Sequence, residues 1–300
     1  MKIPLSLAAA AARWMPGWLK KAVYRSGPLA RLIRRLLNRS APNGLSQVTV
    51  AAGGLQGASL LIDMQTKKNL WLGTYEPELQ QAIRDWLHPG MVVYDVGANI
   101  GYVSLLLARV VESASSGGAT VKGQVFAFEP LPANLERMEA NFRLNPWAHI
   151  TSVAAAVVDR PGPVRFLAHA SGAMGKAAGS AGRQNEVYLA EIEVEGITLD
   201  QFTYADRRPA DASRDPAPVP QAIKMDIEGG EVLALKGMRR LLSEARPLLL
   251  IELHGPESAR AAWDTLTAAG YQILRMEPGY PPVTSLEALD WKAYIVARPG

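Results

Sequence analysis

The chain has 300 residues, of which 48% are hydrophobic and 20% charged, with 26 glycines, 21 prolines and no cysteine. This composition excludes fibrous, collagen-like and wholly disordered classes, and the lack of cysteine excludes disulfides, thiolate zinc sites and thiol nucleophiles. The net charge of +4 is unevenly placed: residues 1–40 hold nine of the 32 basic residues and no acidic one, which leaves 23 basic against 28 acidic residues downstream. The body is therefore acidic, and we expect no nucleic-acid partner.

The N-terminal region contains one apolar run, residues 3–12, which Pro4 interrupts and which is too short to span a bilayer. We therefore expect a cytoplasmic protein. A cleaved signal peptide is the alternative, because the run of alanines could form a cleavage region.

Residues 28–39 (PLARLIRRLLNR) place leucine and isoleucine at helical spacing, which predicts an amphipathic helix. Its opposite face is basic and carries Arg31, Arg34, Arg35 and Arg39. We favour a helix that packs on the main domain with solvated arginines. The alternative is a peripheral contact with an anionic membrane surface or with a partner protein.

A glycine-rich turn inside residues 47–63 separates two β-branched stretches, which predicts a β-hairpin. Residues 75–87 (YEPELQQAIRDWL) suit a helix, because Pro77 stands in the first turn and the apolar residues share one face. We therefore expect three parts: a basic helical extension over residues 1–45, a hairpin and helix over 46–90, and the main domain over 91–300.

Short apolar strands alternate with helical patterns through the main domain. The predicted strands cover residues 91–95, 124–129, 150–157, 222–226, 247–253 and 271–276, with helices between most of them. Such alternation is typical of an α/β, doubly wound and mostly parallel sheet. Ligands of these sheets bind beyond the carboxyl ends of the strands, so chemistry is expected there.

The first of these strands ends in a glycine turn that leads into a helix. Asp95, Gly97, Ala98, Asn99 and Gly101 make up the turn, where glycine allows a close backbone approach and the helix start offers free N–H groups. The spacing differs from the G-x-G-x-x-G pattern of dinucleotide folds, and it suits an amino-acid tail better than a diphosphate. Asp95 could then attract the ligand's ammonium group. A turn that serves only the fold is the alternative.

Other strands end in charged residues at the same expected edge. The second strand ends in Glu129 and Pro130, where a carboxylate could accept the hydroxyls of a ribose. The strand at 222–226 and the residues after it carry Lys224, Asp226 and Glu228, and the next strand ends in Glu252 and His254.

Taken together, these motifs resemble the FkbM family of S-adenosylmethionine-dependent methyltransferases. The resemblance covers roughly residues 70–275 and rests on GTYEPEL (73–79), VVYDVGANIGYVSLLLAR (92–109), VFAFEPLPAN (125–134), NFRLNP (141–146), ITLDQF (197–202), IKMDIEGGEVLALKG (223–237) and RPLLLIELH (246–254). It implies a class I, Rossmann-like methyltransferase fold with a seven-stranded sheet, preceded by the helical and hairpin extension. It also implies methyl transfer, usually to a hydroxyl of a sugar, polyketide or similar natural product.

The resemblance further assigns roles to single residues. Glu129, with Pro130 beside it, would bind the ribose, and Asp226 would face the transferred methyl group. The adenine contact would come from the segment from Ala156 to Asp159. The methionine end would lie on Asp95, Gly97, Ala98, Asn99 and Gly101.

Methyl transfer to an alcohol needs alignment and removal of the hydroxyl proton. We expect Asp226 and His254 as candidate bases, because histidine normally titrates near neutrality, with Lys224 and Glu228 tuning them. His254 could instead be a satisfied structural residue.

The predicted contacts to a small-molecule or glycan acceptor are Tyr75, Glu76, Glu228 and Glu252. Asp226 with Glu252 or His254 could hold a divalent ion, but the spacing is no metal signature, so no metal is expected. A non-catalytic S-adenosylmethionine-binding module and a nicotinamide-dependent oxidoreductase are the alternative functions. No oligomeric state is predicted.

Two flexible stretches lie between the strands predicted at 150–157 and 222–226. Residues 171–184 (SGAMGKAAGSAGRQ) are rich in glycine, alanine and serine, and we expect them to form a mobile lid over the acceptor. Residues 207–220 contain several prolines, which favours a surface insertion.

Overall fold

The computed structural model describes residues 41–112, 114–116, 119–169, 175–182, 188–204, 217–290 and 292–300, with isolated positions before residue 41. The chain divides into two compact units, one formed by Met1–Gln80 with Ala140–Trp147 and the other by Gln81–Glu139 with Ala148–Gly300. The predicted basic helix over residues 28–39 lies outside the described residues, apart from single positions. None of the helices in the described part of the chain combines the length and the apolar character that a bilayer crossing needs.

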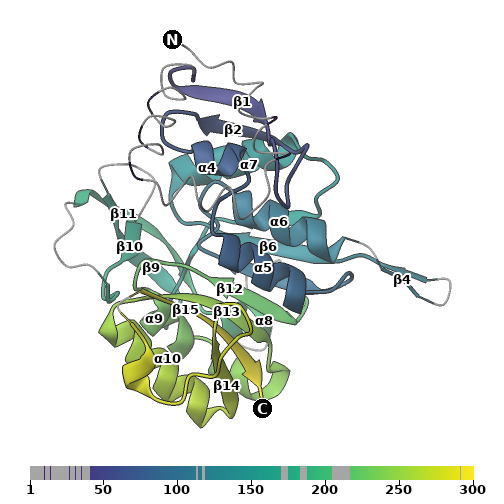
Figure 1. Ribbon diagram of the computed structural model, residues 1–300. Helices are drawn as coiled ribbons and strands as arrows, with labels where there is room; N and C mark the ends of the chain where they lie inside the picture. Colours follow the sequence, from purple (N-terminus) through teal and green to yellow (C-terminus); the bar gives the residue numbers. More distant parts are fainter. Residues whose placement is uncertain are drawn as a thin grey trace. The chain divides into compact units, whose positions relative to one another are not determined.

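A seven-stranded sheet forms the centre of the larger unit (Figure 1). Its strands, from edge to edge, are β14 (Tyr271–Arg275), β15 (Lys292–Pro299), β13 (Leu248–His254), β12 (Ala222–Met225), β3 (Val92–Val96), β6 (Gln124–Phe128) and β7 (Ile150–Val153). β15 pairs antiparallel with both of its neighbours, whereas the pairings from β13 to β7 are parallel. The predicted α/β, mostly parallel seven-stranded sheet is therefore confirmed, and the carboxyl ends of β6, β3, β12 and β13 share one edge.

Helices and short helical turns connect these strands, and three of the helices begin at a proline. They are α5 (Pro77–Trp86), α6 (Tyr102–Val111), α7 (Pro132–Arg143), α8 (Leu199–Thr203), α9 (Glu231–Lys236), the π-helical turn η2 (Leu241–Ala245), α10 (Pro256–Ala268) and the 3-10 turn η3 (Leu286–Ala288). Proline opens α5, α7 and α10, where its missing N–H costs no hydrogen bond. Between β12 and β13 the helical segment is divided into α9 and η2, because Gly237 ends α9.

Four aromatic rings pack together beside β3 and β6. Tyr94, Phe126, Phe128 and Phe202 have ring centroids 5.0–5.7 Å apart, in edge-on or tilted contacts. Tyr94 is fully buried, and its hydroxyl donates to the carbonyl of Pro218 at 2.9 Å. This cluster fixes the centre of the sheet against α8.

A second sheet of four strands belongs to the same unit. Its order is β10 (Gly175–Ala177), β9 (Gly162–His169), β11 (Tyr188–Ile197) and β8 (Ala156–Val157). The strand predicted over residues 150–157 is thus wrong in extent: it ends at Val153, and β8 pairs with β11 instead. The cause is a tight turn, in which the N–H of Ala155 donates to the carbonyl of Val153. A short ribbon, β4 (Ala114–Ser116) with β5 (Ala119–Val121), extends the connection between α6 and β6.

In the smaller unit, β1 (Leu45–Thr49) pairs antiparallel with β2 (Ser59–Asp63) and forms the predicted hairpin, which α4 (Lys68–Trp71) follows. The far edge of β2 is covered by two asparagines, one in the last turn of α7 and one just after it. Asn145 accepts from the N–H of Ser59 at 3.1 Å and donates to its carbonyl at 2.7 Å, while Asn141 accepts from the N–H of Leu61 at 2.6 Å. Side-chain amides thus replace a third strand.

We expect Asn145→Ala to lower the free energy of unfolding by about 1–3 kcal/mol, because both backbone groups of Ser59 lose a buried partner. Urea unfolding of the variant measures this change. Asn43→Ala, an exposed asparagine of the same unit, is the matched control and should leave stability unaltered. Equal stability of both variants would show that the amide does not hold the hairpin edge.

Candidate active site

The glycine turn after β3 lies between the ends of β6 and β12. The N–H groups of Gly97 and Ala98 donate to the carbonyl of Phe128, at 3.1 and 2.9 Å. Gly97 has a φ of +82°, and a Cβ there would collide with the carbonyl of Asp226. Gly101, with a φ of +84°, ends the turn and precedes α6. Glycine is therefore required at position 97 for both conformation and space.

A buried ion pair lies directly beneath this turn. Lys224 Nζ is 3.0 Å from Asp95 Oδ1 and donates to the carbonyl of Gly97 at 3.1 Å, while Ser104 donates to Asp95 Oδ2 at 2.6 Å. Asp95 is fully buried and Lys224 nearly so. The structure brings these two charged groups to each other. The ligand contact predicted for Asp95 and the tuning role predicted for Lys224 stay predictions.

Glu129 lies at the carboxyl end of β6, as predicted, and is 5% exposed. Its Oε2 accepts from the N–H of Asn99 at 2.9 Å. Its Oε1 accepts from the N–H of Leu131 at 2.9 Å and from the amide of Asn134 at 3.4 Å. Burial raises the pKa of Glu129 to about 7, although these hydrogen bonds and the charge of Lys224 oppose the rise.

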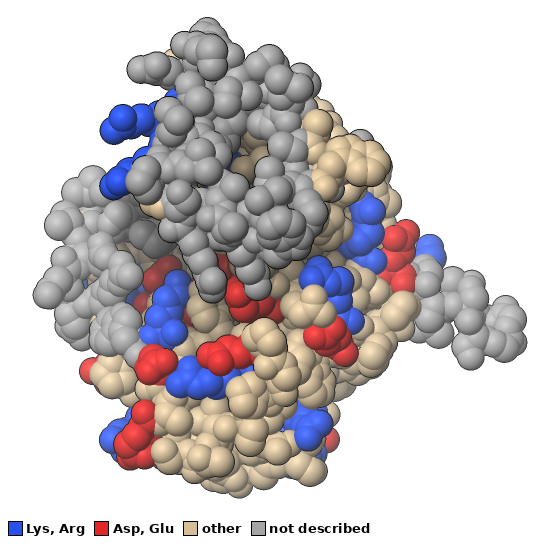
Figure 2. All heavy atoms as spheres, in the orientation of Figure 1, with Lys and Arg blue, Asp and Glu red and all other residues tan. Residues whose placement is uncertain are grey.

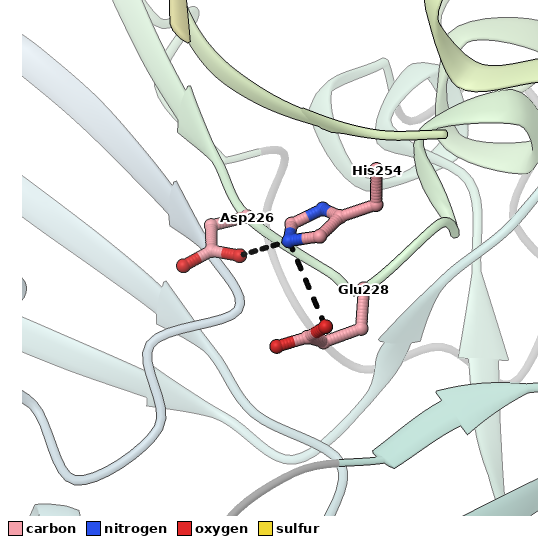
Figure 3. A group of neighbouring side chains, drawn as sticks. All are labelled: Asp226, Glu228 and His254. Carbon is pink, nitrogen blue, oxygen red and sulfur yellow. Dashed lines mark ion pairs between the residues drawn. The ribbon is translucent and has the colours of Figure 1, made fainter. Parts of the chain in front are cut away.

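His254, at the end of β13, is surrounded by four carboxylates. Its Nε2 is 3.2 Å from Glu252, 3.6 Å from Glu228 and 3.8 Å from Asp226, and its Nδ1 is 3.2 Å from Glu231. Figure 3 shows that Asp226 and Glu228 approach the same ring nitrogen from the loop after β12. The structure thus brings together Asp226, Glu228, Glu252 and His254, which the sequence singled out separately.

The protonation state of His254 follows from these neighbours. Burial opposes the charged form, but hydrogen bonds to Glu231 and Glu252 and the charges of Glu231 and Asp226 outweigh it and raise the pKa of His254 to about 10. For Glu252, burial is likewise outweighed, by His254 and Lys292, and its pKa falls to about 2. The predicted base role of His254 assumed a pKa near neutrality. A ring with this raised pKa holds its proton at neutral pH and has no free lone pair with which to accept another.

Glu231 is a partner of His254 that is not among the site residues predicted from the sequence. It is fully buried at the start of α9, and its Oε1 accepts from the N–H of Ile227 at 3.2 Å and contacts His254 Nδ1. Its Oε2 accepts from the hydroxyl of Ser258 on α10 at 3.0 Å. The sequence signal for Glu231 was its place in the quoted segment IKMDIEGGEVLALKG (223–237), five residues after Asp226.

The loop that carries Asp226 and Glu228 is held in an uncommon backbone conformation. Glu228 has a φ of +53° and Gly229 a φ of +101°. A residue with a side chain in the left-handed region costs on the order of 1–3 kcal/mol, and this conformation persists where the surroundings impose it.

Asp226 and Glu228 are also the exposed carboxylates of the cluster, with side chains 22% and 37% exposed. With His254 they offer three ligand atoms within 4.8 Å of one another, so this group could hold a metal ion.

The remaining predicted site residues are placed as follows. Ala156 is buried in β8 and packs in an apolar cluster with Leu131, and its adenine contact stays a prediction. Tyr75 and Glu76 belong to the smaller unit, and their acceptor contacts stay a prediction. Pro130 follows Glu129 directly and is half-buried.

The chain matches the methyltransferase FkbM domain over residues 95–273, more than half of its length. A comparison with curated proteins found no match.

Solved structures of methyltransferases resemble the chain at low identity. A methyltransferase FkbM from Methylobacillus flagellatus KT is 21% identical, with a TM-score of 0.38, over 78% of this chain and 54% of that one. A precorrin-6y C5,15-methyltransferase from Geobacter metallireducens GS-15 is 14% identical, with a TM-score of 0.41, over 75% and 88%. A SAM-dependent O-methyltransferase from Thermotoga maritima is 14% identical, with a TM-score of 0.38, over 74% and 65%.

The strand order and the motifs at the strand ends define a class I methyltransferase fold. The domain match then fixes the family: the chain belongs to the FkbM methyltransferases, and its activity is S-adenosylmethionine-dependent methyl transfer.

We expect the His254 ring to be protonated at neutral pH. Because its pKa is raised, the stability it contributes is fully present below pH 6.5 and is lost as the pH rises through about 10. Heteronuclear NMR of the imidazole over a pH titration measures the pKa directly.

The matched variants are Glu231→Gln and Glu257→Gln. The first removes the charge at Nδ1 and should lower the pKa of His254, whereas the second removes an exposed charge on α10 and should not. Titration of the wild-type ring near pH 6.5 would contradict the assignment.

Proposed function

We propose that this methyltransferase transfers the methyl group to a hydroxyl oxygen of a small molecule or glycan, with Asp226 as the base. The observation that carries the proposal is the position of the Asp226 carboxylate. The side chain of Asp226 is partly exposed, and the residue follows β12 directly. The backbone carbonyl of Asp226 packs against Gly97 of the predicted cofactor turn. An open carboxylate next to the cofactor turn is suited to orient a hydroxyl and take its proton.

The residues around the glycine turn fit S-adenosylmethionine. Glu129 is a buried carboxylate whose Oε2 accepts a single N–H, from Asn99, in the described structure. A carboxylate oxygen has two acceptor positions, so Oε2 can accept a ribose hydroxyl as well. Its raised pKa shows that burial is not fully compensated, and ligand hydroxyls would supply the compensation. Gly97 and Gly101, both at a left-handed φ, shape the turn over which the methionine end is proposed to lie.

The cofactor, when bound, supplies a methyl group already activated by its sulfonium. The chain's own residues then have two tasks, to align the acceptor and to take its proton. The imidazolium of His254 is positioned to stabilise the negative charge of Asp226 and Glu228, which would otherwise repel each other. Glu252 is ionised through its contacts with His254 and Lys292, so it balances charge and carries no proton at neutral pH.

The charge distribution supports a small acceptor over a nucleic acid. On the face shown in Figure 2, acidic and basic side chains lie interspersed, and among the described residues no continuous basic stripe crosses it. Nucleic-acid binding relies on such a stripe to neutralise phosphates. The acidic cluster around His254 would in addition repel a phosphate backbone.

We expect Asp226→Asn to lower kcat at least about 100-fold while cofactor affinity stays within about twofold, because the amide keeps the shape but cannot accept the proton. The assay uses S-adenosylmethionine with a tritiated methyl group and a panel of purified sugars, oligosaccharides and phenols, with calorimetry for binding. Asp264→Asn on α10, an exposed aspartate, is the control. Full turnover by Asp226→Asn would remove this residue from the mechanism.

We expect Glu129→Gln to weaken S-adenosylmethionine binding about 10- to 150-fold, since hydrogen bonds to a charged acceptor contribute about 1.5–3 kcal/mol. Isothermal titration calorimetry of the folded variant measures the loss. Exposed Glu136→Gln on α7 serves as the control. Unchanged affinity of Glu129→Gln would place the ribose elsewhere.

A further inference from the structure

The segment from Gly175 to Gly182 is part of the four-stranded sheet. β10 pairs with β9 through Gly175 opposite Ala168 and Ala177 opposite Phe166. Buried Lys176 then donates to the carbonyl of Ala181 at 3.2 Å and closes the turn that follows β10. The middle of the predicted lid, residues 175–182, is thus tied to a sheet, while the rest of that stretch lies outside the described residues.

The end of this segment is in backbone contact with the loop that carries Glu228. The N–H of Ala181 donates to the carbonyl of Gly229 at 2.9 Å. A Cβ on Gly182 would lie 2.7 Å from the carbonyl oxygen of Glu228, and a Cβ on Gly229 would collide with the carbonyl of Ala181. The two backbones therefore meet where neither glycine leaves room for a side chain.

This contact falls on the left-handed turn of the loop that carries Asp226 and Glu228. Glu228, with its φ of +53°, directs its carboxylate at His254 Nε2, 3.6 Å away (Figure 3). A non-glycine residue keeps such a conformation only where neighbouring groups impose it. Within the described part of the chain, the backbone atoms of Ala181 and Gly182 lie directly against the Glu228–Gly229 turn.

We infer that Ala181 and Gly182 are positioning residues, which hold the Glu228 carboxylate at the acceptor side of the site and so couple the four-stranded sheet to methyl transfer. The inference rests on the proposed function. It assigns β9 to β11 of this sheet a part in acceptor binding, whereas the predicted ribose and methionine contacts lie at the ends of β6 and β3.

The chain offers a matched pair of variants. Gly182→Ala and Gly179→Ala lie three positions apart in one turn, and both place alanine at a left-handed φ, +82° and +87°. Only at position 182 would the new methyl group press on Glu228; at position 179 no atom lies within 4 Å. The backbone strain is therefore common to both variants, and the push on Glu228 is specific to one.

We expect Gly182→Ala to raise the KM for the acceptor at least about tenfold with unchanged affinity for S-adenosylmethionine, and Gly179→Ala to alter neither. Glu228→Gln should cause a similar loss, and the double variant Gly182→Ala/Glu228→Gln should lose no more than Glu228→Gln alone, because both act on one carboxylate. Equal acceptor KM for the two glycine variants, or additive losses in the double variant, would overturn the inference.

Two further measurements separate this inference from the proposed function. The NMR chemical shift of His254 Nε2 reports the nearby Glu228 without turnover, so Gly182→Ala should move it and Gly179→Ala should not. Absence of turnover by the wild-type chain would contradict only the proposed function.

If Gly182→Ala does not fold, the variant Lys176→Met takes its place, because it removes the side-chain donor to the carbonyl of Ala181. An unmoved His254 resonance in that variant would overturn the inference.

Discussion

The buried ion pair between Lys224 and Asp95 is the interaction on which the site depends. It joins the two central strands, β12 and β3, at their carboxyl ends, and the same ammonium group holds the carbonyl of Gly97. Removing one partner of a buried pair typically costs about 3–5 kcal/mol, because the other charge stays behind in a medium that solvates it poorly. The ion pair therefore fixes the base of the glycine turn. In that turn Gly97 packs against the backbone carbonyl of Asp226, so the ion pair also helps to position Asp226.

The chemistry then divides between two kinds of carboxylate. Glu129, Glu231 and Glu252 are buried and each accepts hydrogen bonds from the protein, so they position other groups. Asp226 and Glu228 are partly open and share the imidazolium of His254. The buried imidazolium thus allows two negative charges to converge at the proposed acceptor site, and the positive charge of the ring is itself maintained by Glu231.

Much of the fold could be predicted from the sequence, because parallel strands that are covered on both faces appear as continuous apolar runs. The strand ends that carry Glu129 and Asp226 followed from the same pattern. What could not be predicted were pairings that depend on strand order and side-chain direction. Lys224 and Asp95 are 129 positions apart and become neighbours only because β12 lies next to β3. The protonation of His254 required Glu231 and Glu252 to be placed in space, and the contact of Gly182 with Glu228 required the second sheet.

The most direct test of this account is a crystal structure with S-adenosylhomocysteine bound. We predict that the ribose hydroxyls contact Glu129, that the amino-acid end lies over the turn from Gly97 to Gly101, and that the sulfur faces the side where Asp226 and Glu228 are exposed. A nucleoside bound away from Glu129, or a sulfur directed away from Asp226, would contradict it.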